Sequence, residues 1–168
     1  MLELLAPTTG LRDAWLRARD DWGPGVHEDG FGIGPDDDVD SPEGFAAWVA
    51  RLNDQGDPAR PLPDGRVHAT CRWIVEDGEV LGGIALRHEL TGAAARLGHI
   101  GYGIRPSARG RGIATWALGA MLDEARALGL PRVLLVCRAD NSASAKTIER
   151  NGGVLESSDR VLRYWIEL

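Results

Sequence analysis

The stretch Ile100–Thr115, IGYGIRPSARGRGIAT, decides the fold of this chain. Its β-branched and aromatic residues predict a strand that ends near Ile104, and Pro106 and Ser107 predict the turn that follows. Two glycines and two arginines then lead into a segment with helical spacing of apolar residues. The stretch therefore predicts a strand, a glycine-rich turn and a helix, in that order.

The helix after the turn has a wide apolar stripe, with apolar residues three and four positions apart. Gly129 is expected to end it, and Pro131 prevents its continuation. The stripe consists of Ile113, Ala117, Leu118, Met121, Leu122, Ala125 and Leu128.

The turn before this helix suits a pyrophosphate group. The first turn of a helix has backbone N–H groups without internal partners and a partial positive charge. Glycine lets a ligand approach that backbone closely, and Arg109 and Arg111 add two permanent positive charges. The predicted phosphate-binding residues are Arg109, Gly110, Arg111, Gly112, Ile113, Ala114 and Thr115.

Two other interpretations of the turn stay open. It can be a mobile turn with a solvated basic tip. It can also be a dinucleotide-binding turn, because Gly110 and Gly112 match the first two glycines of that motif. However, Thr115 stands at the third position, and no strand ending in an acidic residue follows about 20 residues later.

Composition indicates one ordinary globular domain spanning residues 1–168, with 43% hydrophobic and 26% charged residues. The net charge of −6 argues against a nucleic-acid partner and is compatible with a cationic substrate. No apolar run reaches the length of a membrane span, so no membrane partner is expected. Cys71 and Cys137 lie in apolar runs, which favours buried free thiols over a disulfide or a metal site and fits a cytoplasmic location.

The N-terminal part predicts a short strand over Met1–Leu5 and then a first helix, whose face contains Leu11, Trp15, Leu16 and Trp22. The glycine-rich and acidic segment Gly23–Asp40 is expected to be a long loop, because periodicity is lost there. A second helix should start at Ser41 and Pro42, a good N-cap and a good first helical residue.

The acidic loop has two interpretations. It can be a solvated connection, or a lid that attracts an amine. Asp36, Asp38 and Asp40 imitate the start of a calcium-binding loop, but Ser41 and Ala47 replace the glycine and glutamate that such a loop needs. Calcium is therefore rejected, and no metal is expected.

Strand patterns follow. Val67–Val75 and Val80–His88 should form a hairpin around Asp77–Gly78, with Arg96–Ile104 as the next antiparallel strand. A strand over Arg132–Cys137 comes after the helix, and this crossover predicts that it runs parallel to the strand before the turn. The remaining predicted elements are a short helix over Asn141–Asn151 and an antiparallel pair over Gly153–Ser157 and Val161–Leu168.

This order of elements and two motifs resemble the GNAT superfamily of acyl-CoA-dependent N-acetyltransferases. The hallmark Q/R-x-x-G-x-G/A is matched by Arg109, Gly112 and Ala114. A second signature, an Asn three residues before a small residue in a helix that ends at glycine, is matched by Asn141, Ser144 and the Asn151–Gly153 turn. The stretches GHIGYGIRPSARGRG and NSASAKTIERNGGVLE also look like a bacterial branch of the superfamily.

The resemblance implies a GNAT-like α/β fold. Its sheet has about seven mostly antiparallel strands with one central parallel pair, and about four helices flank it. The implied activity is transfer of an acetyl group from acetyl-CoA to a primary amine of a small molecule or peptide. The amine attacks directly, without a covalent enzyme intermediate and without a metal, and a homodimer is common in the superfamily. The alternative is a non-catalytic acyl-CoA-binding or regulatory module on the same scaffold.

The resemblance also implies roles for single residues. Backbone groups near Gly103 and Ile104 would pair with the pantetheine arm and the thioester carbonyl, and the N–H groups of 110–115 would hold the pyrophosphate. Asn141 would bind the pantetheine region, and Ser144 would lie near the sulfur.

Two familiar acid–base residues of the superfamily are replaced here. Val136 stands where many protein N-terminal acetyltransferases have a Glu, and Ile148 stands where the usual proton donor is a Tyr. An amine with a pKa of about 10.4 must lose a proton before it attacks, so another group or water must act as base. The expected candidates are His99, and after it His88, as base, with Ser144 and Tyr164 as proton donors.

Overall fold

The computed structural model describes all 168 residues of the chain. In chain order its elements are β1 (Leu2–Leu5), η1 (Thr9–Leu11), α1 (Arg12–Trp22), α2 (Pro42–Gln55), β2 (Ala69–Glu76), β3 (Glu79–Arg87), α3 (Ala94–Leu97), β4 (Ile100–Ile104), η2 (Pro106–Ala108), α4 (Ile113–Ala127), β5 (Arg132–Arg138), α5 (Ser142–Arg150), β6 (Val154–Ser158) and β7 (Val161–Glu167). The mixed α/β class and the seven strands agree with the sequence prediction.

The strands form two sheets. One has the order β1-β2-β3-β4 and the other β5-β7-β6, and every neighbouring pair is antiparallel. The expected parallel ladder between β4 and β5 is not formed, since the two strands belong to different sheets. An isolated antiparallel bridge joins Gly98, just before β4, to Leu135 of β5. Beyond this bridge β4 and β5 separate, and a split lies between the two strands.

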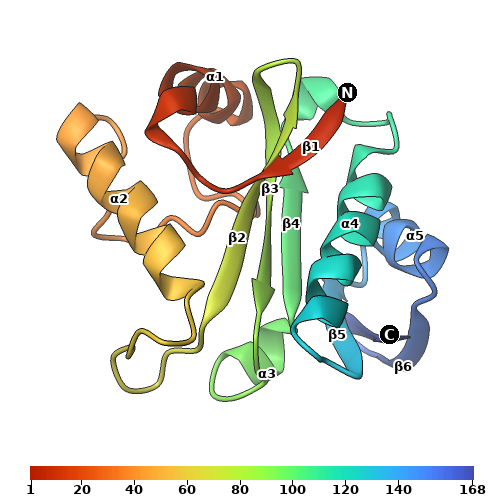
Figure 1. The fold of residues 1–168 in the computed structure, drawn as a ribbon. Helices are drawn as coiled ribbons and strands as arrows, with labels where there is room; N and C mark the ends of the chain where they lie inside the picture. The colour runs from red at the N-terminus through yellow and green to blue at the C-terminus, as the bar shows by residue number, and fades with distance from the viewer.

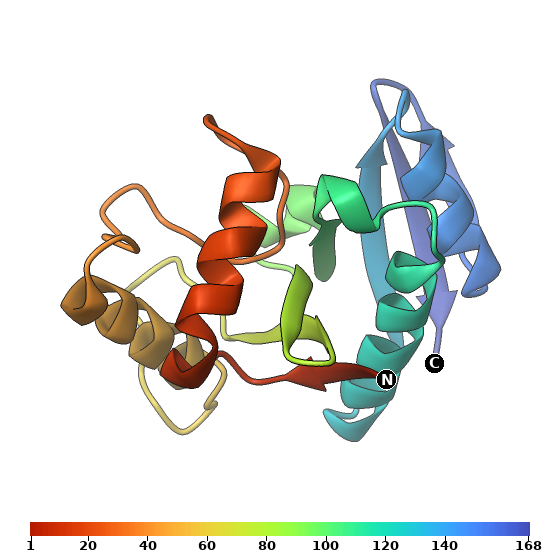
Figure 2. The same cartoon turned by 90° about the horizontal axis from the view of Figure 1, so that it is seen from above.

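Two layers of helices cover the first sheet. Figure 1 shows α1 and α2 on one side of β2 and β3, and α4 with α5 on the other side. Strands alternate their side chains between these layers: Trp73 and Val75 of β2 belong to the core under α1 and α2, and Ile74 belongs to the core under α4. The view from above shows the second sheet beyond α4, well separated from α1 and α2 (Figure 2).

The hairpin and helix boundaries follow local sequence signals. Asp77 and Gly78 have φ of 50° and 82°, as a two-residue hairpin turn requires. The side chain of Ser41 accepts a hydrogen bond from the backbone N–H of Gly44, with Pro42 as first residue of α2. These elements match the predicted ones within one or two residues.

Two further details of the prediction are wrong. A helical turn, α3, occupies residues 94–97, where a turn followed by a strand from Arg96 was expected. Gly98, with φ of 83°, ends this turn, so β4 begins only at Ile100. Leu128 is 44% exposed and does not belong to the buried stripe of α4, because it lies at the C-cap where the helix leaves the core.

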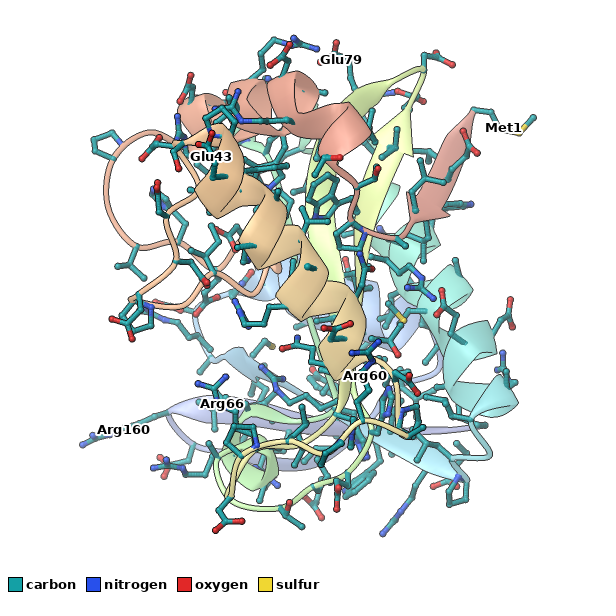
Figure 3. The ribbon with its side chains drawn as sticks, turned by 60° about the vertical axis from the view of Figure 1, so that its left-hand side comes forward. Met1, Glu43, Arg60, Arg66, Glu79 and Arg160 are labelled. Atoms are coloured by element: carbon teal, nitrogen blue, oxygen red, sulfur yellow. The ribbon has the colours of Figure 1, made fainter.

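The Gly23–Asp40 loop has no helix or strand, as expected, and most of its acidic residues have structural partners. The carboxylate of Asp37 accepts from the Arg51 guanidinium at 2.5 Å, and that of Asp38 accepts from the Ser41 hydroxyl at 2.5 Å. Phe31 of the loop is buried in the core under α1 and α2. Figure 3 shows the loop beside the beginning of α2, which Glu43 marks.

Candidate active site

The candidate site is the split between β4 and β5, and His99 sits at its closed end. The backbone N–H of His99 donates to the carbonyl of Leu134 at 2.7 Å. Its ring Nδ1 accepts a hydrogen bond from the backbone N–H of Leu134 at 2.8 Å. The ring nitrogen thus takes the place of the backbone carbonyl that would accept this bond in a regular sheet. His99 is buried, and its burial lowers its pKa, with a further contribution from the nearby Arg87 charge, which favours the neutral ring. The structure therefore gives His99 a structural role at the start of the split, rather than the free imidazole expected of a base.

Beyond His99 the backbone of β4 presents unpaired groups to the split. On its other side β4 pairs with β3, and Arg105 N–H donates to Leu81 O at 2.8 Å while Arg87 N–H donates to His99 O at 2.6 Å. Because an antiparallel ladder alternates, the odd-numbered residues of β4 bond to β3, and the backbone groups of Tyr102 and Ile104 point toward β5. The free groups expected near Gly103 and Ile104 are thus those of Tyr102 and the N–H of Ile104. The Ile104 carbonyl accepts from Arg109 Nε, and the groups of Gly103 face β3.

The glycine-rich turn at residues 109–115, called the cradle below, has an open backbone at both of its glycines. Gly110 and Gly112 have φ of 79° and 76°, and Gly112 is the N-cap of α4. No atom lies within 4 Å of the place where a side chain of either glycine would begin. Left-handed glycines at a helix start expose backbone N–H groups to an anion, so the turn fits a pyrophosphate.

The two arginines of the turn differ in their partners. Arg109 donates from Nε to the carbonyl of Ile104 at 2.9 Å, which fixes the turn to the end of β4. Arg111 forms an ion pair with Glu76 at 2.6 Å and is half exposed. Arg111 can therefore exchange this surface partner for a phosphate at small cost.

Asp21 at the end of α1 anchors the chain just before the cradle. One carboxylate oxygen accepts from Arg105 Nε at 2.8 Å and from the Ser107 hydroxyl at 2.5 Å. The Ser107 hydroxyl and the Arg105 guanidinium lower the pKa of Asp21 to about 2. The sequence did not indicate this link, because Asp21 is 84 residues from Arg105.

The second predicted motif lies on the far wall of the split. The Asn141 side chain accepts from the Ser144 N–H at 3.1 Å, so it is the N-cap of α5. The Asn151 amide donates to Thr115 O at 3.2 Å and Thr147 O at 2.9 Å, which attaches the end of α5 to α4. Asn141 and Ser144 are half-buried and accessible, as a ligand-binding role requires.

Ser144 meets a residue that the sequence analysis did not select. Its hydroxyl oxygen lies 2.8 Å from the hydroxyl of Tyr102, so β4 and α5 are joined across the split. Burial raises the pKa of Tyr102 to about 12, which keeps its proton in place at neutral pH. Burial also raises the pKa of the neighbouring Cys137 thiol, opposed by its contact with the Ser144 hydroxyl. The alternation of β4 was a usable signal, since it places Tyr102 on the same face as Ile100 and Ile104.

The other candidates are less favourably placed. The Tyr164 hydroxyl donates to the Glu149 carboxylate at 2.7 Å, its ring is buried, and its pKa is raised to about 12 by burial and by Glu149. His88 lies beyond the end of β3, with its Nε2 2.8 Å from the Thr70 hydroxyl. That end of β3 pairs with the start of β4, so His88 is at the opposite end from the cradle.

Comparison with known proteins assigns the chain to a family. Residues 12–154 match a family model described as an acetyltransferase (GNAT) domain. The chain therefore belongs to the GNAT acetyltransferase family, and the predicted resemblance is confirmed. No curated protein sequence matches the chain.

Solved structures of acetyltransferases share the fold. A probable acetyltransferase has a TM-score of 0.72 and 18% identity, with coverage of 99% of this chain and 92% of that one. RimL, a ribosomal L7/L12 alpha-N-protein acetyltransferase in complex with coenzyme A through a cysteine disulfide, has a TM-score of 0.70, 21% identity and coverage of 99% and 94%. RimJ from Mycobacterium smegmatis, in complex with CoA-disulfide, has a TM-score of 0.69, 22% identity and coverage of 99% and 81%.

Two further observations concern metals and membranes. No group of three or more His, Cys, Asp or Glu side chains is arranged to hold a metal ion. No helix has the length and apolar character that crossing a lipid bilayer requires. Both cysteines are free and buried, as the sequence predicted.

Proposed function

We propose that this acetyltransferase moves the acetyl group of acetyl-CoA to a primary amine by direct attack. The observation that supports this most strongly is the open split between β4 and β5, into which the backbone groups of Tyr102 and Ile104 point. A flexible amide-containing arm can pair with such a strand edge as an added strand would. The glycine cradle lies at the same end of β4, where the phosphates of that arm would arrive.

The residues of the chain divide the binding of acetyl-CoA between them. The N–H groups of residues 110–115 and the Arg111 guanidinium would hold the pyrophosphate, and Ile104 would pair with the pantetheine amides. Asn141 still has an amide N–H₂ to donate, because its hydrogen bond with the Ser144 N–H uses only the oxygen. The N–H of Tyr102 would donate to the thioester carbonyl oxygen, where negative charge develops during attack.

Ser144 and Tyr102 would serve the departing thiolate. The Ser144 hydroxyl would donate a hydrogen bond or a proton to the sulfur, and Tyr102 would donate a hydrogen bond to the Ser144 oxygen through their 2.8 Å contact. A tyrosine whose pKa is about 12 keeps its proton at neutral pH, so Tyr102 is a hydrogen-bond donor to Ser144 throughout the reaction. A thiol has a pKa near 8.5, so this assistance is smaller than the assistance that the incoming amine needs.

The acceptor is a primary amine of a small molecule or of a peptide. The named activity of RimL on a ribosomal protein supports the peptide option. Val136, in place of the Glu of many protein N-terminal acetyltransferases, supports the small-molecule option. The expected homodimer and cytoplasmic location stay predictions.

Direct tests are a calorimetric titration with acetyl-CoA and an assay of free thiol release across a panel of amines. Binding together with amine-dependent release supports the proposal. Binding without release on any amine would favour the acyl-CoA-binding module instead. Absence of binding would contradict the assignment of the cradle and of the split.

A further inference from the structure

A second hollow lies on the opposite side of β4 from α5, where the Gly23–Asp40 loop meets the end of α1. Its volume is about 430 Å³. The apolar part of its wall consists of Trp22, Phe31 and Ile33, and the polar part includes Arg19, Asp20, His27 and Asp29. The edge contact between Trp22 and Phe31, with ring centroids 5.4 Å apart, gives this wall a fixed shape.

Asp29 is the acidic group of the hollow that no cation neutralises. Arg19 forms ion pairs with Asp20 and Asp40, so its charge is already compensated. His27 contacts the carbonyl of Gly23 through its Nε2 at 3.0 Å. The carboxylate of Asp29 accepts the backbone N–H of Phe31 at 2.9 Å, and no side chain donates to it.

Asp29 is also half-buried, which is unusual for an unpaired carboxylate. Burial raises the pKa of this carboxyl above its usual range. The loop thus holds an acidic group in a place that favours either a bound cation or a proton.

Backbone packing places the loop at Asp29 directly against β4, the strand that borders the split. The loop crosses β4 so closely that a side chain on Gly103 would begin 2.6 Å from the Cα of Asp29. A side chain on the neighbouring Gly30 would begin 3.0 Å from the Cα of Tyr102. The three glycines Gly30, Gly83 and Gly103 permit this contact. Asp29 therefore lies against Gly103, and Gly30 lies against Tyr102, whose backbone groups point into the split.

We propose that Asp29 receives the acceptor amine and takes its proton, and that the acceptor is a primary ammonium attached to an apolar or aromatic group. This inference rests on the proposed acetyl transfer and adds the acceptor class and the base to it. The ammonium would lie at the Asp29 carboxylate, and its apolar part would lie against Trp22 and Ile33. An ammonium is attracted both by a carboxylate and by the face of a tryptophan.

The proton and electron balance of this step is complete. The ammonium gives one proton to Asp29, and the freed nitrogen lone pair forms the C–N bond with the acetyl carbon. The C–S bond then breaks, and its electron pair leaves with the sulfur. As the amide forms, the nitrogen loses its second proton, and this proton replaces, through solvent, the one that Ser144 gives to the thiolate. Asp29 finally releases its proton to solvent, and the products are the amide and free coenzyme A.

The test uses the full chain saturated with coenzyme A and titrated calorimetrically with 2-phenylethylamine at pH 8. The first variant is Asp29→Asn, which keeps an oxygen for the Phe31 N–H and so preserves the loop. The matched control is Asp36→Asn, an exposed acid of the same loop outside the hollow. We expect wild type and control to bind equally, and Asp29→Asn to bind at least about tenfold more weakly, because a charge-assisted contact is lost.

Two results would overturn the inference: equal binding by Asp29→Asn and wild type, or equal binding of the anionic analogue 3-phenylpropionate. Absence of amine binding to wild type would overturn it too. Thiol release from acetyl-CoA, measured on the same samples, tests the proposed function separately. Amine binding that depends on Asp29, together with no thiol release by wild type, would support the amine site and contradict acetyl transfer. Where release occurs, a raised KM and a lowered kcat in Asp29→Asn, with unchanged acetyl-CoA affinity, support both roles of this carboxylate.

Discussion

The hydroxyl groups of Tyr102 and Ser144 meet at 2.8 Å and join β4 to α5 across the split between β4 and β5. One residue comes from the strand before the cradle, and the other from the helix that Asn141 caps. The strand before the first family motif and the helix of the second motif are therefore joined by a polar contact between residues 42 positions apart. This contact lies where the sulfur of acetyl-CoA is expected.

Ser144→Ala should lower kcat about tenfold to hundredfold, toward the lower end of the range for general acid catalysis, because a thiolate leaves with little help. The affinity for acetyl-CoA should stay within about twofold, since the phosphates and pantetheine keep their contacts. Tyr102→Phe should give a smaller decrease. The control is Ser142→Ala, an exposed serine of the same helix turn. Steady-state kinetics check this, and wild-type kcat in both Ser144→Ala and Tyr102→Phe would exclude the pair from the reaction.

Gly112→Glu should abolish binding of acetyl-CoA, because it places bulk and negative charge in the cradle. Any side chain at this position is also strained, since Gly112 has φ of 76°. Gly129→Glu is a matched control, with φ of 80°, open space around it and a place at the other end of α4. Both variants should lose similar stability, about 1 kcal/mol, and only the first should lose binding in calorimetry. Unchanged affinity in Gly112→Glu would contradict the phosphate assignment.

His99→Ala should reduce the free energy of unfolding by about 1–3 kcal/mol, because the buried N–H of Leu134 loses its acceptor. The pKa of His99 is lowered in the folded state, so the unfolded chain binds the proton first as the pH falls. Wild-type stability should therefore decrease between pH 7.5 and pH 5.5, and His99→Ala should lack this part of the decrease. Urea unfolding at both pH values measures it. A stable variant with a strongly lowered kcat would instead restore His99 as the base.

Asp21→Asn should lower the free energy of unfolding, and the size of this loss should depend on pH. The folded pKa of Asp21 is about 2, below its usual 3.8, so its contribution is complete above pH 4 and is lost as the pH falls toward 2. The stability difference between wild type and Asp21→Asn should therefore be larger at pH 5 than at pH 3. Denaturant unfolding at these two pH values checks the sign, and a difference that grows at pH 3 would contradict it.

Local signals explain why much of the fold was predictable. Asp77–Gly78, Ser41–Pro42 and the glycines of the cradle fix backbone conformations within a few residues, so the sequence alone locates those boundaries. The apolar stripe of α4 was predicted for the same reason, apart from Leu128 at its end.

The remaining features depend on contacts between distant segments, which no local pattern encodes. The split begins where the His99 ring accepts a hydrogen bond from the backbone N–H of Leu134, 35 residues away. The loop containing Asp29 crosses β4 because Gly103 leaves room for it, more than 70 residues further on. Likewise, the acidic loop was open to interpretation as a solvated connection or a lid, and the sequence did not show that Asp37 and Asp38 bond to Arg51 and Ser41.

The most direct measurement is the release of free thiol when acetyl-CoA and a primary amine are mixed with the full chain, with mass detection of the N-acetylated product. Transfer of acetyl from acetyl-CoA predicts equal amounts of thiol and acetylated amine from wild type, and neither from Gly112→Glu. Tight binding of acetyl-CoA without any product from the amine panel, or equal release by wild type and Gly112→Glu, would contradict it.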